Sequence, residues 1–226
     1  MQALILAGGK GTRLRPYTTV LPKPLLPVGD MPIIEILIRQ LKYYGFTKIS
    51  IAVGYLPELF KAVINSKFED ITFIHESTPL GTAGAIALLE AEDNFLVVNG
   101  DTLTDLDFSA FFKFHTDRGC LGTIAAHERE ITAEYGVLEV LLTPVLNKYL
   151  EKPTWKHLAS MGVYAFKREI QSGISGRVDI PDLINSQSGL FQCFQTDAFW
   201  LDVGRPSDYE RAQEEFGKRR ESLMHE

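Results

Sequence analysis

A glycine-rich loop close to two cations is the segment of this sequence best suited to chemistry. Residues 3–6 form an apolar run that predicts a buried strand, and three glycines follow it: Gly8, Gly9 and Gly11. Because glycine adopts positive φ freely, such a loop can turn its backbone N–H groups toward an anion. Arg13 and Lys23, the latter between two prolines, add positive charge nearby. This combination predicts a site for a polyphosphate.

The loop differs from both common glycine-rich phosphate motifs. It lacks the Gly-Lys-Ser/Thr ending of a P-loop, and Leu14 stands where a dinucleotide fingerprint would need its third glycine. An ordinary turn between a strand and a helix is the alternative interpretation. Arg13 and Lys23 favour the phosphate interpretation, with Lys10 as a supporting cation in the loop.

Two aspartates supply the second half of the predicted chemistry. Asp101 follows the apolar run 95–98, and Asp202 follows the apolar run 199–201. Ligands of open α/β sheets bind at the carboxyl ends of strands, so the two carboxylates could meet there. Because Mg²⁺ commonly takes one or two carboxylates plus phosphate oxygens, the pair predicts a magnesium site. The simpler alternative makes Asp101 a turn residue and Asp202 a helix cap.

The elements that must position these residues alternate between strand and helix. After the first strand we expect strands at 48–53, 71–74 and 95–98 and helices at 33–41, 57–64 and 82–89. The second half predicts a helix at 107–116, strands at 122–126, 136–140, 146–150, 162–166, 191–196 and 199–201, and a helix from about 206. This alternation predicts an α/β fold: a Rossmann-like single domain over residues 1–226, with a mixed, mostly parallel central sheet flanked by helices.

Composition narrows the classes of partner. The net charge of −6 argues against a nucleic-acid surface, because no long basic cluster offsets it. No run approaches the ~20 apolar residues of a membrane span, and the first apolar run is too short for a signal peptide. Cys120 and Cys193 lack metal-ligand spacing and are expected to be buried free thiols. We therefore expect a cytoplasmic protein with no nucleic-acid or membrane partner.

The segment Leu-Ala-Gly-Gly-x-Gly-Thr-Arg-Leu-x-Pro at 6–16, followed by Lys-Pro at 23–24, resembles the signature of the sugar-1-phosphate nucleotidyltransferases (NDP-sugar pyrophosphorylases). Further matches lie at 79–84, 99–101, 135–137, 151–153, 161–164 and 202–204, so the resemblance spans nearly the whole chain. It implies attack of a sugar 1-phosphate on the α-phosphorus of a nucleoside triphosphate, with Mg²⁺ as cofactor. Larger relatives append a left-handed β-helix, which we do not expect here.

The resemblance also assigns roles to residues. Its catalytic residues would be Arg13, Lys23, Asp101 and Asp202, of which Asp101 and Asp202 hold the metal. Its nucleotide-binding residues would be Leu6, Ala7, Gly8, Gly9, Gly11, Thr12, Arg13, Glu76, Gly81 and Thr82. Its sugar-phosphate-binding residues would be Gly136, Glu151, Lys152, Ser160 and Met161. Relatives often form oligomers, so a homo-oligomer is among the expected partners, beside the two substrates.

The base is predicted from Glu76, which stands where uridylyl- and thymidylyltransferases of this kind carry glutamine, although a simple surface role for Glu76 is the alternative. An ionised glutamate only accepts hydrogen bonds, and guanine offers two adjacent donors. GTP is therefore favoured, and the run 79–84 resembles guanylyltransferases for mannose or heptose 1-phosphate. Some short muramate-type uridylyltransferases also carry glutamate there, so UTP with N-acetylmuramate 1-phosphate stays an alternative.

Two other classes of protein compete with this interpretation. A glycosyltransferase on a similar sheet would use an Asp-x-Asp metal motif, a form that Asp105 and Asp107 share. Those two residues lie several positions beyond the strand, and capping explains them better. A catalytically inactive nucleotide-binding relative is the other class. The intact cations and aspartates argue against it.

Overall fold

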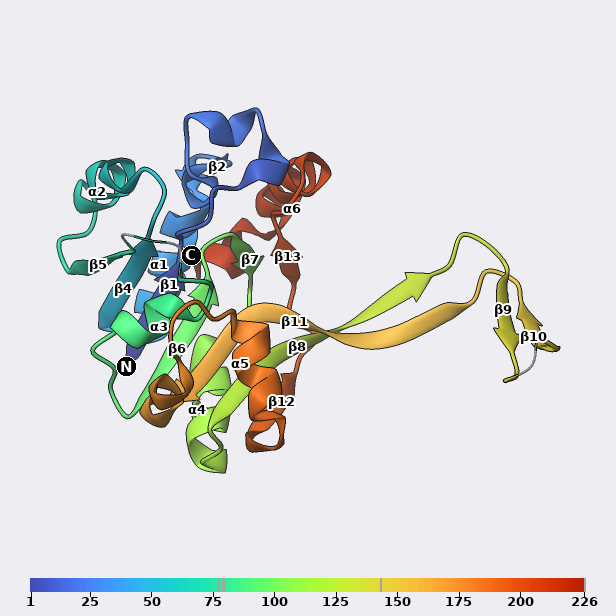
Figure 1. Cartoon of the computed structure of the whole chain (residues 1–226). Helices are drawn as coiled ribbons and strands as arrows, with labels where there is room; N and C mark the ends of the chain where they lie inside the picture. The colour runs from blue at the N-terminus through green and yellow to red at the C-terminus, as the bar shows by residue number, and fades with distance from the viewer. Residues whose placement is uncertain (77, 79, 143, 226) are drawn as a thin grey trace.

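The computed structural model describes residues 1–76, 78, 80–142 and 144–225 and has a seven-stranded sheet at its centre (Figure 1). The strands run in the order β12-β8-β11-β6-β1-β4-β5. Their bounds are β1 Gln2–Leu6, β4 Lys48–Val53, β5 Ile71–His75, β6 Asn94–Asn99, β8 Gly122–Thr132, β11 Thr154–Lys167 and β12 Phe191–Gln195.

Strand directions make the sheet mixed but mostly parallel. β1 pairs in parallel with β4 and β6, β4 with β5, and β12 with β8. β11 is the antiparallel strand, and it pairs with both β6 and β8. The predicted α/β class with a mixed, mostly parallel sheet is confirmed.

Alternation along the strands explains why helices cover both faces of the sheet. In β1, Ala3 and Ile5 pack into one apolar cluster, whereas Leu4 packs into another on the opposite face. The first cluster is covered by α1 Ile33–Tyr43, α2 Pro57–Asn65 and α4 Phe108–Arg118. The second is covered by α3 Gly84–Leu88 and α5 Ile180–Ser186. Because helices pack on both faces, the carboxyl ends of the parallel strands are held in place.

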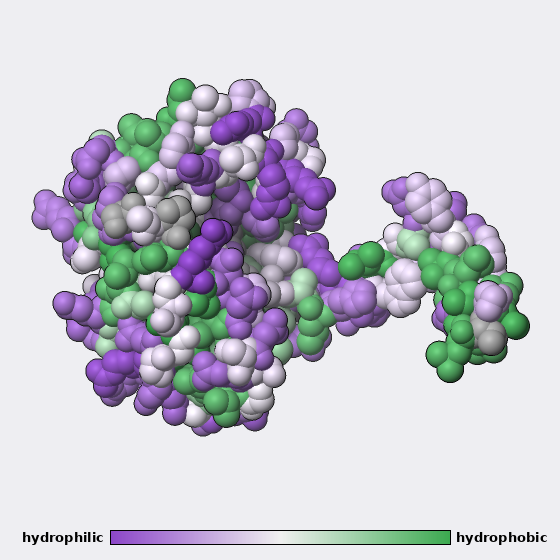
Figure 2. All heavy atoms as spheres, viewed as in Figure 1, coloured by the Kyte–Doolittle hydropathy of each residue, from purple (hydrophilic) through white to green (hydrophobic). Residues whose placement is uncertain are grey.

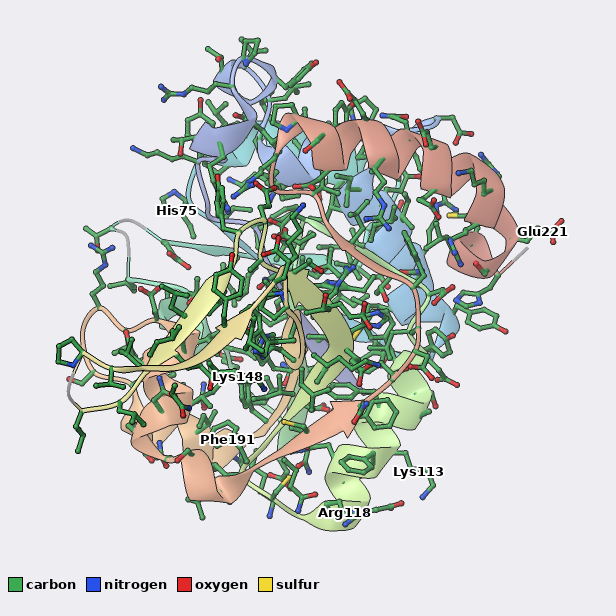
Figure 3. All side chains as sticks on the ribbon, turned by 90° about the vertical axis from the view of Figure 1, so that its right-hand side faces the viewer. His75, Lys113, Arg118, Lys148, Phe191 and Glu221 are labelled. Atoms are coloured by element: carbon green, nitrogen blue, oxygen red, sulfur yellow. The ribbon has the colours of Figure 1, made fainter. Side chains whose placement is uncertain are left out.

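A third apolar cluster joins the two ends of the chain. α6, Pro206–Met224, packs Ala212 and Phe216 against Ile33 and Ile36 of α1. The short sheet β7 Thr102–Thr104 with β13 Trp200–Asp202 contributes Leu103 and Leu201 to the same cluster. In Figure 3, α6 with Glu221 and α4 with Lys113 and Arg118 lie at opposite ends of the body.

The outer halves of β8 and β11 leave the body together as a long two-stranded ribbon (Figure 1). We define residues 128–158 as the arm and the remainder as the body. The tip of the arm carries the hairpin of β9 Val137–Val140 and β10 Leu146–Leu150. The strands predicted at 122–126 and 162–166 are only the parts of β8 and β11 inside the central sheet. The outer parts are rich in charge, such as the Lys156–Glu128 pair at 2.7 Å, and gave no strand signal.

Several short elements were not predicted. They are β7, α5, the pair β2 Pro27–Val28 with β3 Met31–Pro32, and the 3₁₀ turns η1 Thr12–Leu14, η2 Tyr17–Thr19, η3 Lys23–Leu25, η4 Arg168–Gly173 and η5 Ser188–Leu190. Within the described residues, no helix is long and apolar enough to cross a membrane. Cys120 is half-buried, but Cys193 is exposed rather than buried, because it lies on β12 at the edge of the sheet.

Candidate active site

The glycine loop folds back so that Lys23 comes to lie beside it. Gly11 has φ 59°, and a Cβ there would lie 3.0 Å from the Thr18 side chain and 3.1 Å from that of Lys23. The Thr18 hydroxyl donates a hydrogen bond of 2.7 Å to the Gly11 carbonyl. The chain between Arg13 and Lys23 is therefore packed onto the loop at a position where glycine is required.

Gly8 also lies close to two other segments, at Gly54 and at Glu76. A Cβ on Gly54 would lie 3.1 Å from the Gly8 carbonyl oxygen, and a Cβ on Gly8 would lie 3.7 Å from the Glu76 carboxylate. Glu76 is half-buried, and this burial raises the pKa of its carboxyl above the ordinary value, while a backbone hydrogen bond from Leu80 lowers it. Its carboxylate thus lies over the loop.

These segments enclose a cavity of about 430 Å³ at the carboxyl ends of β1 and β6. It brings together most of the predicted nucleotide-binding residues and catalytic residues. Its lining residues are Leu6, Ala7, Gly8, Gly9, Gly11, Arg13, Lys23, Pro24, Ala52, Glu76, Gly81, Thr82, Asn99, Asp101 and Asp179. Of the predicted nucleotide-binding set, Thr12 is exposed and does not line the cavity. Pro79, within the 79–84 run, lies outside the described residues.

Lys23 joins the two predicted metal-binding aspartates. Its ammonium forms ion pairs with the Asp101 carboxylate and, at 3.5 Å, with the Asp202 carboxylate, although Lys23 is itself only 8% exposed. Burial raises the pKa of the Asp202 carboxyl, and the neighbouring Asp101 raises it further, against the opposing effect of Lys23 and Arg13. Lys23 and Asp101 line the cavity, whereas Asp202 does not line it and is joined to them through its ion pair with Lys23.

Backbone pairing brings these aspartates together although they are far apart in sequence. Asp202 ends β13 and lies opposite Thr102 of β7, directly beside Asp101. The Val203 N–H also donates to the Asp101 carbonyl at 3.2 Å. The predicted meeting of Asp101 and Asp202 therefore depends on β7, a three-residue strand that the sequence pattern did not indicate.

The donor set of this aspartate pair fits magnesium. Both groups are carboxylates, and an all-oxygen set with few protein ligands is what Mg²⁺ accepts when phosphate oxygens and waters complete its coordination. Among the described residues no cluster of three or more His, Cys, Asp or Glu side chains is placed to hold a metal. Asp101 and Asp202 are the residues that would bind the ion.

Asp179 lines the cavity but was not among the residues predicted from the sequence. Its Oδ1 accepts hydrogen bonds from the Thr82 N–H at 2.9 Å and the Thr82 hydroxyl at 3.2 Å. Ile180 N–H in turn donates to that hydroxyl at 2.8 Å. The start of α5 thereby clamps the loop that contains Gly81. An aspartate two residues before Pro181 is an N-terminal helix signal that could have indicated α5.

The predicted sugar-phosphate residues are not brought to this cavity within the chain. Gly136, Glu151 and Lys152 lie on the arm, outside the body. Gly136 is required locally, because a Cβ there would collide with the ring of Tyr149. The Tyr149 hydroxyl donates to Glu151 at 3.1 Å.

Ser160 and Met161 lie where the arm joins the body, and neither lines the cavity. Met161 is fully buried in the first apolar cluster, the main core of the body, because it begins the buried stretch of β11. The sequence placed Met161 in the sugar-phosphate pocket, whereas its side chain lies in the core. Ser160 is exposed, and its hydroxyl donates to Tyr164 at 3.3 Å.

Known proteins resemble this chain in sequence over most of its length. The nucleotidyl transferase family model matches residues 2–219. The chain belongs to this family. A mannose-1-phosphate guanyltransferase of Kluyveromyces lactis is 35% identical to this nucleotidyl transferase over 229 residues, covering 92% of the chain and 63% of the relative. The chain thus spans less than two thirds of that relative's length.

Solved structures share the fold of this nucleotidyl transferase. HddC from Yersinia pseudotuberculosis has a TM-score of 0.77 at 29% identity, over 95% of this chain and 99% of HddC. The same protein complexed with GMP-PN gives a TM-score of 0.75 at 30% identity, with the same coverage. A candidate glucose-1-phosphate thymidylyltransferase of Bacillus anthracis gives 0.74 at 24% identity, which supports the fold alone.

Proposed function

We propose that this nucleotidyl transferase moves GMP from GTP onto a sugar 1-phosphate of the mannose or heptose type, with Mg²⁺, releasing GDP-sugar and pyrophosphate. The observation that carries the proposal is the ion pairing of Lys23 with both Asp101 and Asp202, because Lys23 and Asp101 line the cavity together with the glycine loop. We further propose that residues 1–226 act as one catalytic unit in the cytoplasm.

Residues of this chain can bind the triphosphate of the nucleotide. Backbone N–H groups of the glycine loop can donate to phosphate oxygens, and the Arg13 guanidinium can bind two phosphate oxygens at once. Lys23 adds a point charge from the buried side. These groups neutralise the negative charge that builds on pyrophosphate as it leaves, which is the main electrostatic requirement of phosphoryl-type transfer.

The reaction needs no general base. The attacking oxygen of the sugar 1-phosphate is already anionic; it forms a bond to the α-phosphorus while the bond from that phosphorus to the bridging oxygen of pyrophosphate breaks. When bound by Asp101 and Asp202, Mg²⁺ would offset the charge of the α-phosphate. Lys23 holds both carboxylates in place through its ion pairs. Positioning therefore carries most of the catalysis.

Glu76 supports guanine as the base. Its carboxylate lies over Gly8 at the cavity wall and offers acceptors to the two adjacent donors of guanine. The HddC structure complexed with GMP-PN and the relatives named mannose-1-phosphate guanyltransferase support the same choice.

The deciding experiment measures pyrophosphate release from GTP, UTP, CTP, ATP and dTTP against mannose, heptose, glucose and N-acetylmuramate 1-phosphates, with Mg²⁺ or with EDTA. We expect release with GTP and a mannose- or heptose-type acceptor, and none with EDTA or with Asp202→Asn. Preference for UTP and N-acetylmuramate 1-phosphate would overturn the base assignment. No release with any pair would overturn the activity.

A further inference from the structure

The arm exposes apolar surface that nothing in the chain covers. No described residue between 127 and 160 is buried. Eleven of the eighteen exposed large apolar side chains among the described residues lie on the arm, and Figure 2 shows a concentration of hydrophobic residues at its outer end. These eleven are Ile131, Tyr135, Leu138, Val140, Leu141, Leu142, Val145, Leu146, Tyr149, Trp155 and Leu158. A patch of this kind marks an interaction surface.

The arm has internal order but no core of its own. Cross-strand contacts hold its base, among them the Thr132–Thr154 hydroxyl hydrogen bond of 2.8 Å and the Lys156–Glu128 ion pair of 2.7 Å. Two-stranded ribbons without further packing are marginal in water. The arm is therefore an ordered element that lacks the surface against which it would be stable.

The same arm carries the residues missing from the cavity. Glu151 and Lys152 are the segment for which the family resemblance implies contacts with the sugar and its phosphate, and both are exposed near the arm's tip hairpin. Lys152 has φ 44°, a left-handed backbone conformation that non-glycine residues adopt rarely and often at functional sites. Neither Glu151 nor Lys152 lines the cavity in the body.

The arm's attachment keeps Lys152 away from the chain's own cavity. The ribbon pairs continuously from Thr132–Thr154 inward to Ala126–Ser160, where it joins the central sheet. From Ser160 to Lys152 the extended chain spans roughly 26 Å. Figure 3, which views the arm end-on, shows Lys148 of the tip projecting in front of the body. The pairing of β8 with β11 shifts register between Ser160 and Tyr164, so the ribbon leaves the central sheet there with its own pairing intact.

We propose that two copies of this chain exchange arms, so that Glu151 and Lys152 of one copy complete the sugar 1-phosphate site beside Asp202 of the other. The inference rests on the proposed function. Two exposed apolar side chains of the body, Tyr17 and Val20, lie in the segment between Arg13 and Lys23 and are available for contact with an incoming arm. An exchange about a two-fold axis covers both arms with one repeated contact.

The test mixes two inactive variants. Lys23→Ala removes a body cation, and Lys152→Ala removes an arm cation; each alone should lower turnover about 100-fold or more. Co-expressed at equal levels and purified through two different tags, their mixed dimers contain one site that carries neither change. The unfractionated mixture should recover about a quarter of the wild-type rate, because half of its dimers are mixed and one of two sites in each is intact.

Other outcomes of this test overturn the proposal. If the arm served its own chain, every site in a mixed dimer would carry one of the two changes, and the mixture would stay as inactive as its parents. If Lys152→Ala alone kept wild-type turnover and wild-type KM for the sugar 1-phosphate, the arm would not contribute to a site. Recovery is expected only from exchange.

A second measurement is independent of activity. Light scattering should give a dimer for the wild type and a monomer for Leu146→Asp, whose side chain is 54% exposed at the arm's tip hairpin. Leu190→Asp, a body site that is 55% exposed, is the matched control and should stay dimeric. A monomeric wild type, or a dimeric Leu146→Asp, would overturn arm exchange. A dimer that Leu146→Asp dissociates, with no turnover of any substrate pair, would contradict the proposed function alone.

Discussion

The body and the arm use apolar residues in opposite ways. In the body, alternation along the strands and apolar stripes on the helices direct side chains such as Ile5, Leu37 and Phe111 into one apolar cluster. Each of these three side chains is at most 1% exposed. In the arm, Leu142 and Val140 are as apolar but fully or largely exposed. The body is a folded scaffold that positions a cavity, and the arm is an extension whose apolar residues serve an interface.

The two regions also carry the two halves of the proposed site. The nucleotide half is assembled by strand ends and a packed loop, so its geometry is fixed by the core. The sugar-phosphate half lies on a ribbon that has no core. This difference teaches that a motif can match a family in sequence while the fold places it far from the cavity of its own chain. The following predictions probe the difference.

The largest effect is expected for the buried cation of the body. Lys23→Met should lower kcat about 10²–10³-fold, because it removes a preorganised charge at the phosphates and leaves Asp101 and Asp202 without their shared partner. Steady-state kinetics measure it. Lys10→Met, at an exposed loop position outside the cavity lining, is the control and should change kcat less than about tenfold. Equal losses in both variants would contradict the role of Lys23.

The next largest difference between the body and the arm is expected in the free energy of unfolding. Met161→Ala should lower the free energy of unfolding by roughly 2–5 kcal/mol, because Met161 is fully buried in the main cluster. Trp155→Ala, on the arm and 40% exposed, should cost at most about 0.5 kcal/mol in dilute, monomeric protein. Urea denaturation followed by circular dichroism gives both values. A larger loss for Trp155→Ala would mean that the arm contributes to the core of its own chain.

Selectivity for the nucleotide base is expected to depend on the body, and replacing one carboxylate oxygen of Glu76 by an amide nitrogen should change it. Glu76→Gln replaces an acceptor by a donor and acceptor, so the ratio of kcat/KM for GTP to that for UTP should fall about tenfold, the loss of one hydrogen bond to a charged group. A competition assay with both nucleotides measures the ratio. Glu151→Gln on the arm should leave this ratio unchanged. An unaltered ratio in Glu76→Gln would contradict the guanine contact.

The same residue predicts a pH dependence. Burial raises the pKa of Glu76, and only its ionised form offers two acceptor oxygens to the two donors of guanine. As the pH falls through this raised pKa, the ionised fraction decreases and KM for GTP should rise, beginning at a higher pH than for an ordinary glutamate. In Glu76→Gln this rise should disappear. KM measured across the acidic range of both proteins checks it.

The smallest effect compares two aspartates that precede helices of the body. Asp179→Ala and Asp107→Ala should each cost about 1 kcal/mol of stability, because Asp179 accepts hydrogen bonds from Thr82 and Asp107 caps α4 by accepting from Ala110 at 2.8 Å. Only Asp179→Ala should raise KM for GTP, because only Asp179 lines the cavity. Thermal unfolding and steady-state kinetics on both variants separate stability from binding. A raised KM in Asp107→Ala would contradict this separation.

Much of the body could be predicted from the sequence because its signals are local. Apolar runs of the right length gave β1, β4 and β6, the 3.6-residue stripe gave α1, and Asp107 was expected as a cap, which the Ala110 hydrogen bond confirms. The glycine loop followed from residue type, since positive φ at Gly11 is a local requirement.

Other features depended on contacts that no local pattern encodes. The place of Asp179 in the cavity follows from α5 packing on the second face of the sheet, and Met161 entered the core because β11 is central. The length of β8 and β11 was underestimated because their outer halves carry charges and bury nothing.

By itself the sequence determined the fold class and the glycine-rich loop motif, and it predicted which residues would act on a nucleotide. Those properties reside in residue type and short spacing, which act within a few residues of chain. Only the tertiary structure decided that Asp202 meets Asp101 through β7 and Lys23, and that Glu151 and Lys152 project away from their own cavity. Strand pairing and packing between distant segments set those positions, and they depend on the whole chain at once.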